Sequence, residues 1–171
     1  KKFSQLLYRM VQKYQPAAIV ELGTSFGIST AYLANANPTA KVYTLEGAAS
    51  IASSAQHHFN SLGIKSIELI PGDFDDSLPA LLTGLKSVDF AFIDGNHRKV
   101  PTLQYLHQLA ALANEDSIFI FDDIHWSAEM EDAWQNIKAH PAVTLTIDLF
   151  FIGIVIFKKD FKAKQHFVIR F

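Results

Sequence analysis

The 171-residue sequence contains no cysteine. Disulfide bonds, zinc sites built from thiolates and catalysis by a thiol are therefore excluded. No apolar run approaches the length of a membrane-spanning helix, and no charged-then-apolar secretory leader opens the chain. We therefore expect a soluble, cytoplasmic protein with no membrane partner. Basic residues are not in excess either, since 15 Lys and Arg stand against 17 Asp and Glu. The lack of a basic excess argues against a nucleic-acid partner.

Apolar residues make up 49% of the chain, which is enough for a sizeable core. No repeat, low-complexity segment or interdomain linker divides the sequence, so residues 1–171 are expected to form a single domain. The chain begins Lys1-Lys2-Phe3 without an initiator methionine, and we expect that an N-terminal piece is missing.

Segments with strand and helix patterns alternate along the chain. Continuous apolar strands that alternate with helices are typical of a parallel sheet covered on both faces. Two closely spaced strands around Gly153 predict a hairpin near the end. The expected strands are residues 17–22, 41–45, 66–70, 88–93, 117–121, 143–149 and 154–157. The expected helices lie at about 3–14, from the glycine turn to 35, and at 51–62, 78–82, 101–112 and 127–139. Residues 160–171 fit only an additional strand.

The most informative stretch is Ala17–Ala34, in which an apolar run ends in Glu21 and a turn with Gly23 and Gly27 follows. A buried strand, a tight turn and a helix N-terminus are expected here, which is where open α/β sheets hold nucleotide-like ligands. Glycine at these positions would let the backbone approach a ligand closely. A dinucleotide fingerprint would need glycine at Ser25 and Ile28, and a P-loop would need a lysine after Gly27. The pattern is instead acid-x-Gly-x-x-x-Gly.

Acidic residues recur at the ends of the expected strands. Because the carboxyl ends of parallel strands meet at one edge of a sheet, these side chains are expected along the rim where ligands bind. The residues concerned are Glu21, Glu46, Asp73, Asp94 and Asp122.

The glycine pattern and the series of acids resemble the class I S-adenosylmethionine (SAM)-dependent methyltransferases over about residues 17–157. The resemblance implies a Rossmann-like methyltransferase fold, with a mostly parallel seven-stranded sheet, helices on both faces and a C-terminal antiparallel hairpin. It implies that Glu46 accepts hydrogen bonds from the ribose hydroxyls, that Asp73 lies beside the adenine, and that Glu21 orders the glycine loop. A carboxylate suits a vicinal diol because each of its oxygens can accept one hydroxyl. The cofactor-binding residues implied in this way are Glu21, Gly23, Thr24, Ser25, Gly27, Glu46, Gly47, Gly72, Asp73, Phe74 and Asp94.

Two further stretches, Val88–His97 and Phe119–Ile124, resemble segments of the catechol-type O-methyltransferases. In the metal-dependent members, an acid after the fourth strand and an Asp-Asn pair after the fifth hold a divalent cation. The corresponding residues are Asp94, Asp122 and Asp123, and three oxygen ligands with waters suit Mg²⁺. Asp123 stands where those members carry Asn, so the metal is one of two alternatives. In the other, Asp122 or Asp123 only caps the loop or helix.

Two histidines are candidates for the catalytic base. His97 follows Asp94 by three residues, where the catechol-type enzymes carry a lysine, and a histidine can take a proton near neutral pH. Asp94 is counted with it as a catalytic residue. His125 follows Asp123 and is the second candidate. The other five histidines are expected at ordinary surface or interface positions.

The resemblance implies an enzyme that transfers a methyl group from SAM to a hydroxyl of a small-molecule acceptor, with Mg²⁺ in the metal-assisted form. The alternatives are a metal-independent N- or O-methyltransferase, an NAD-dependent oxidoreductase and a non-catalytic SAM-binding domain. The expected partners are the acceptor and, as one option, a second copy of the chain. Segments before the first strand and after the fourth, fifth and sixth strands would build the acceptor pocket. Their aromatic residues, such as Tyr8, Trp126, Phe150 and Phe151, predict a partly apolar acceptor.

Overall fold

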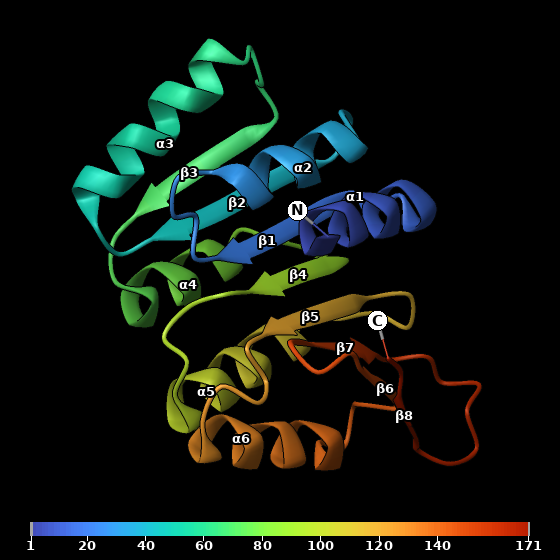
Figure 1. Ribbon diagram of the computed structural model, residues 1–171. Coiled ribbons are helices and arrows are strands. Elements are labelled where there is room, and N and C mark those ends of the chain that lie inside the picture. Colours follow the sequence, from blue (N-terminus) through green and yellow to red (C-terminus); the bar gives the residue numbers. More distant parts are fainter. Residues whose placement is uncertain (1, 171) are drawn as a thin grey trace. The chain divides into compact units, whose positions relative to one another are not determined.

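The computed structural model describes residues 2–170. These residues fall into two compact units, the first ending at Gly84 and the second beginning at Leu85. Each unit consists of strands with helices packed against them (Figure 1).

The first unit has three parallel strands in the order β3-β2-β1. In the pairing register, Leu22 lies opposite Leu45 and Glu46 lies opposite Pro71, so the carboxyl ends of the three strands lie along one edge. Its elements are α1 (Lys2–Tyr14), β1 (Ala18–Leu22), α2 (Ile28–Ala36), β2 (Lys41–Glu46), α3 (Ala49–Ser61), β3 (Ile67–Pro71) and α4 (Phe74–Leu82).

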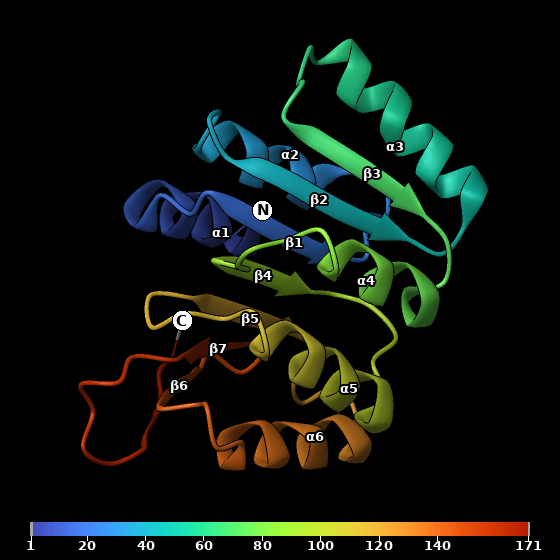
Figure 2. The same ribbon diagram turned by 180° about the vertical axis from the view of Figure 1, so that it is seen from behind.

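Helices cover both faces of the strands in this unit. Figure 1 shows α1 and α2 in front of β1 and β2, and the reversed view in Figure 2 shows α4 in front of its strands. Helix α1 forms because its apolar residues recur at helical spacing, and it buries Leu7 and Val11. Strand β1 is buried on both faces, which is why it is an apolar run rather than an alternating one.

The second unit has five strands in the order β4-β5-β7-β6-β8. Strands β4 and β5 are parallel, β7 is antiparallel to both β5 and β6, and β8 is parallel to β6. Helices α5 and α6 lie side by side in both views. The elements are β4 (Phe90–Ile93), α5 (Lys99–Ala110), β5 (Ile118–Asp122), α6 (Ala128–Ala139), β6 (Leu145–Asp148), β7 (Ile152–Ile156) and β8 (Gln165–Val168).

The alternation of strands and helices and the antiparallel β6–β7 hairpin agree with the expectations from the sequence. The described residues form an eighth strand besides the seven of the expected sheet, because Gln165–Val168 pairs with β6, and this confirms the additional strand expected in residues 160–171. Helix α4 begins at Phe74, four residues before the expected start, because Asp73 caps it. Helix α5 begins two residues before Pro101, which is tolerated there because the first turn of a helix has no backbone acceptor for that N–H.

A close approach of strand and helix organises the core of the second unit. A Cβ atom on Gly153 would lie 2.6 Å from the ring of Trp134, so only glycine lets β7 pass the buried indole.

No helix among the described residues is long and apolar enough to cross a membrane.

Candidate active site

The first part of the candidate site is the turn after β1, which is tied to the end of β2. The backbone amides of Gly23 and Thr24 both donate to the carbonyl of Leu45, at 3.0 and 3.1 Å. The backbone of Gly23 has a φ of 101°, a conformation that disfavours every residue with a side chain. The turn is therefore held in one shape at the rim of the strands.

Glu46 joins this turn to the segment that follows β2. Its Oε2 accepts a hydrogen bond from the Ser25 amide, and its Oε1 accepts one from the Ala48 amide, both at 2.9 Å. A carboxylate has about four acceptor sites, so each oxygen can accept a further donor. The adjacent residue Gly47 is exposed, and a Cβ there would meet nothing within 4 Å.

Glu21 is fully buried beneath the turn. Its Oε2 accepts hydrogen bonds from the hydroxyls of Thr30 and Thr44, and Thr44 is also bonded to Thr24. Its Oε1 has no hydrogen-bond partner among the described residues. Burial raises the pKa of Glu21, against the opposing effect of hydrogen bonds from Ser29 and the two threonines. Glu21 thus braces the turn, and the hydroxyl of Thr24 points into the core.

Gly27 has a packing role that the sequence did not predict. Its φ is 81°, and a Cβ atom on it would lie 2.4 Å from the ring of Phe59 in α3. The space that we expected to face a ligand is therefore filled by this phenylalanine. Gly27 is also the N-cap residue of α2, without a side-chain cap.

Asp73 lies just after β3, where the backbone amide of Gly72 donates to the carbonyl of Glu46 at 2.9 Å. Its Oδ1 accepts a hydrogen bond from the Asp75 amide and so caps α4. The side chain is exposed, and Phe74 opens the helix. Asp73 thus lies on the same edge as Glu46.

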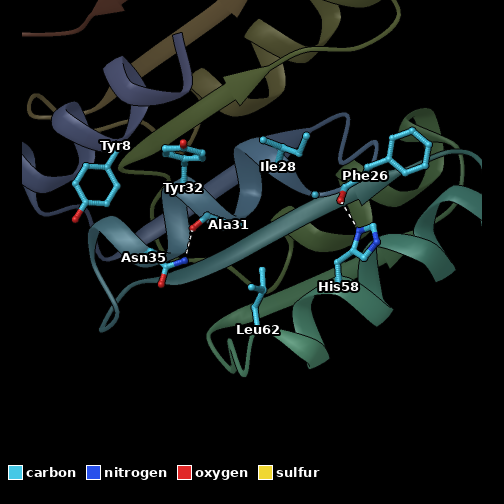
Figure 3. Close-up of a pocket in the computed structure, with 9 residues that line it drawn as sticks. Tyr8, Phe26, Ile28, Ala31, Tyr32, Asn35, His58 and Leu62 are labelled. Carbon is cyan, nitrogen blue, oxygen red and sulfur yellow. Dashed lines mark hydrogen bonds between the residues drawn. The ribbon is translucent and has the colours of Figure 1, made fainter. Parts of the chain in front are cut away.

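A hollow of about 380 Å³ lies on the other side of the glycine turn, over α2 (Figure 3). His58 of α3 and Leu62, which follows this helix, line one side of it, and Tyr8 of α1 lines the other. The Nδ1 atom of His58 is 3.1 Å from the carbonyl oxygen of Phe26, which links α3 to the turn. Of the residues predicted from the sequence, this hollow contains Gly27 and Tyr8, which was expected in the acceptor pocket.

The second unit carries a cluster of three carboxylates. Asp122 ends β5, Asp123 follows it with a φ of 53°, and Asp94 follows β4. Burial, followed by the negative charges of Asp94 and Asp123, raises the pKa of Asp122 to about 7. His97 also acts on this group, and its charge lowers the pKa. The fold therefore brings these four predicted residues together.

His97 lies beside this cluster and is partly exposed to solvent. Its Nε2 is 3.5 Å from Oδ1 of Asp94, and both side chains are about one-third exposed, at 31% and 35%. Among the described residues, no group of three His, Asp or Glu side chains is arranged to hold a metal ion.

His125 is held between two carboxylates. Its Nε2 lies 2.8 Å from Oδ2 of Asp148, and its Nδ1 lies 3.4 Å from Oε2 of Glu131. Asp148 also accepts hydrogen bonds from the Trp134 indole and the Phe150 amide. Both ring nitrogens of His125 therefore face carboxylates, and its role as a second candidate base stays a prediction.

Sequence reasoning missed Asp148 and the threonines around Glu21. Asp148 ends β6, just as the predicted acids end other strands, and this position in the sequence could have identified it as a candidate site residue. Thr44 was recognisable as a polar residue within a buried strand.

The glycine turn, the acids at the strand ends and the α/β fold are those of a methyltransferase. The chain belongs to the family whose model is described as a methyltransferase domain, which matches residues 20–124. A catechol O-methyltransferase of Niastella koreensis is 32% identical over 126 residues, 72% of this chain and 55% of that protein. The chain thus spans about half the length of this relative.

Solved structures show the same fold. An O-methyltransferase from Bacillus cereus in complex with SAH has a TM-score of 0.78 and 23% identity, over 91% of this chain and 80% of that chain. The O-methyltransferase TomG from Streptomyces achromogenes, in complex with SAM, has a TM-score of 0.80 and 22% identity, over 92% of this chain and 80% of that one. The fold class is therefore the Rossmann-like methyltransferase fold.

Proposed function

We propose that this chain transfers a methyl group from SAM to a hydroxyl oxygen of a small-molecule acceptor. The observation that carries the proposal is Glu46, which ends β2 and is tied to the glycine turn in a chain of the methyltransferase family. The names of its relatives, a catechol O-methyltransferase and O-methyltransferases in complex with SAM or SAH, support the choice of cofactor and of oxygen as acceptor. The family match runs through both compact units, which supports one methyltransferase domain.

The residues of the first unit fit an adenosyl cofactor by their chemistry. Glu46 keeps free acceptor sites on both oxygens for the ribose diol, and the turn beside it is fixed by Gly23 and braced by Glu21. The exposed carboxylate of Asp73 is the candidate for the adenine amino group. SAM, when bound, supplies an electrophilic methyl group on a sulfonium. What the protein contributes is mainly orientation.

An alcohol or phenol must lose its proton to accept the methyl group. We assign this step to His97, whose Nδ1 would take the proton while Asp94, 3.5 Å from Nε2, stabilises the charge formed on the ring. Histidine suits the step because its usual pKa lies near neutrality.

A divalent cation is the second means of activating the hydroxyl. Asp94, Asp122 and Asp123 supply the hard oxygen donors that Mg²⁺ prefers, and their mutual repulsion is the kind that a cation relieves. Against it, the described residues form no ready three-ligand group. The ion would hold the acceptor oxygen and lower its pKa.

The test is methyl transfer from SAM to a panel of catechols, alcohols and amines, with products detected by mass spectrometry. We expect O-methylated product, and a loss of at least tenfold in kcat in His97→Ala, whereas His57→Ala, an exposed histidine on α3, serves as control. Activity abolished by EDTA and restored by Mg²⁺ would identify metal assistance. Activity that survives EDTA would leave His97 as the base. Tight SAH binding without turnover on any acceptor would support a non-catalytic SAM-binding domain instead.

A further inference from the structure

Two cavities of the second unit share a wall. The smaller has a volume of about 120 Å³ and includes Asp123 and Trp126. The larger has a volume of about 700 Å³ and extends to the residues after β8, among them Ile169 and Arg170. Both are lined by His125, Phe150 and Phe151. A volume of this size is typical of sites for small molecules.

The shared wall is fixed in position by Asp148. Its Oδ1 accepts a hydrogen bond of 2.8 Å from the Phe150 amide, which holds the turn between β6 and β7 with Phe150 at a φ of 74°. Its carbonyl accepts a bond of 2.8 Å from the Ile169 amide, which holds the segment after β8 against the same turn. The His125 ring lies against Phe150, with 5.6 Å between centroids. The larger cavity is therefore built before any ligand arrives.

The larger cavity is lined by the Asp148 carboxylate and the Arg170 side chain, which have opposite charges. The Asp148 carboxylate faces three donors, namely the His125 ring, the Trp134 indole and the Phe150 amide. Arg170 has no hydrogen bond or ion pair with another described residue. Its guanidinium is the cation that remains available, beside the exposed apolar side chains of Val168 and Ile169. An arginine fork binds a carboxylate or phosphate through two parallel hydrogen bonds.

We propose that the acceptor is an elongated molecule with an anionic end. Its reacting hydroxyl enters the smaller cavity beside Asp123, its apolar middle lies across Phe150 and Phe151, and its carboxylate or phosphate pairs with Arg170 in the larger cavity. This inference rests on the proposed methyl transfer and names the substrate class of that activity. It depends on β8, the strand beyond the seven that the sequence predicted, because β8 brings Arg170 to the β6–β7 turn.

The experiment compares 3,4-dihydroxycinnamate with its methyl ester, since the two share the hydroxyls and the apolar link and differ in charge. Binding to the full chain in the presence of SAH is measured by calorimetry, and methyl transfer is measured in parallel. We expect the acid to bind about two- to fivefold more tightly than the ester, as an exposed charged pair allows. Arg170→Gln should abolish this preference, and Arg170→Lys should retain part of it. Lys159→Gln, at another exposed cation of this unit, should leave it unchanged.

A second variant tests the cavity without touching Arg170. Val168→Glu places a negative charge on an exposed side chain of the same cavity and should weaken binding of the acid alone. Equal binding of acid and ester by the unmodified chain, binding of neither, or an unchanged preference in Arg170→Gln would each overturn the inference. Methyl transfer without a preference for the acid overturns this inference alone. Preference for the acid without any methyl transfer supports the anion site and overturns the proposed activity.

Discussion

The Oε2 atom of Glu46 accepts a hydrogen bond of 2.9 Å from the backbone amide of Ser25, so the acid that ends β2 is fixed to the glycine turn after β1. The two residues are 21 positions apart in the sequence. Parallel pairing of β1 with β2 brings their ends to one edge, which is where a ligand can meet both.

Replacing Glu46 by Gln should weaken SAH binding by about 10- to 100-fold, because charge-assisted hydrogen bonds contribute about 1.5–3 kcal/mol. The amide of Gln also cannot accept on both arms, so the bond to Ser25 or to Ala48 is lost. Calorimetry with SAH measures the effect. Glu68→Gln, an exposed acid on β3 that pairs with Lys41, is the matched control. An equal SAH affinity in both variants would remove Glu46 from the cofactor site.

Gly27→Ala should destabilise the fold by about 2–4 kcal/mol, since a left-handed conformation and overpacking each cost about 1–3 kcal/mol. The new Cβ would lie 2.4 Å from the buried ring of Phe59. Urea denaturation measures the loss. Gly84→Ala is the control because its Cβ would meet only ordinary contacts, the nearest atom being 3.6 Å away. Adding Phe59→Leu should recover the part due to the clash but not the part due to φ, and no recovery at all would contradict the packing argument.

Asp122 should make the free energy of unfolding of the metal-free protein decrease as pH rises from 3.8 to about 7. The folded state raises the pKa of Asp122 to about 7, so in this window the folded chain holds a proton that the unfolded chain releases. More protons in the folded state mean that the free energy of unfolding decreases with pH. Asp122→Asn should flatten this part of the profile, measured by urea denaturation in EDTA. The exposed Asp76→Asn should keep the slope.

Asp123→Asn should shift the same profile to lower pH. The substitution removes one of the two negative charges that raise the pKa of Asp122, and asparagine tolerates the φ of 53°. The midpoint of the Asp122 titration, followed by carboxyl-labelled NMR, should therefore decrease. A midpoint that stays in place would show that the charge of Asp123 does not raise this pKa, and would leave burial and Asp94 as its causes.

Asp148→Ala should destabilise the chain by at least about 2 kcal/mol, because it leaves the buried Trp134 indole without its acceptor and frees His125 and the Phe150 turn. Urea denaturation measures the change, and Asp132→Ala, an exposed acid on α6, is the comparison. Asp132 makes an ion pair with Lys99 at the surface, which contributes about 0–1 kcal/mol. Equal losses in the two variants would show that Asp148 does not organise the turn.

The sequence was sufficient for the fold class because local signals agreed with the tertiary arrangement. The apolar runs of β1, β4 and β5 became strands buried on both faces. Acids at the ends of parallel strands, such as Glu46 and Asp94, took the rim positions that parallel pairing dictates. The ends of elements were less accurate, as in α4, where the Asp73 side chain bonds to a backbone amide and lengthens the helix.

Contacts between distant segments account for what sequence reasoning missed. Position 27 requires glycine because a Cβ atom there would clash with Phe59 of α3. The sequence around a glycine turn does not indicate a packing partner in a distant helix. His125 was a candidate base because it follows Asp123, and the sequence did not indicate that Asp148 of β6 would lie 2.8 Å from its ring. An additional strand was expected in residues 160–171, but β8 has mostly exposed side chains, so no burial pattern indicated that its partner is β6.

The two tryptophans of the chain differ in their surroundings, and this makes each a separate optical reporter. Trp134 is 1% exposed and packs beside Gly153, whereas Trp126 is 72% exposed at the mouth of the smaller cavity. A Trp126→Phe protein would emit from an apolar interior, and its red shift would follow unfolding of the second unit. The fluorescence of the solvated Trp126 indole would instead change when a ligand binds in the smaller cavity. Unfolding and ligand binding can therefore both be followed by intrinsic fluorescence, without any added dye.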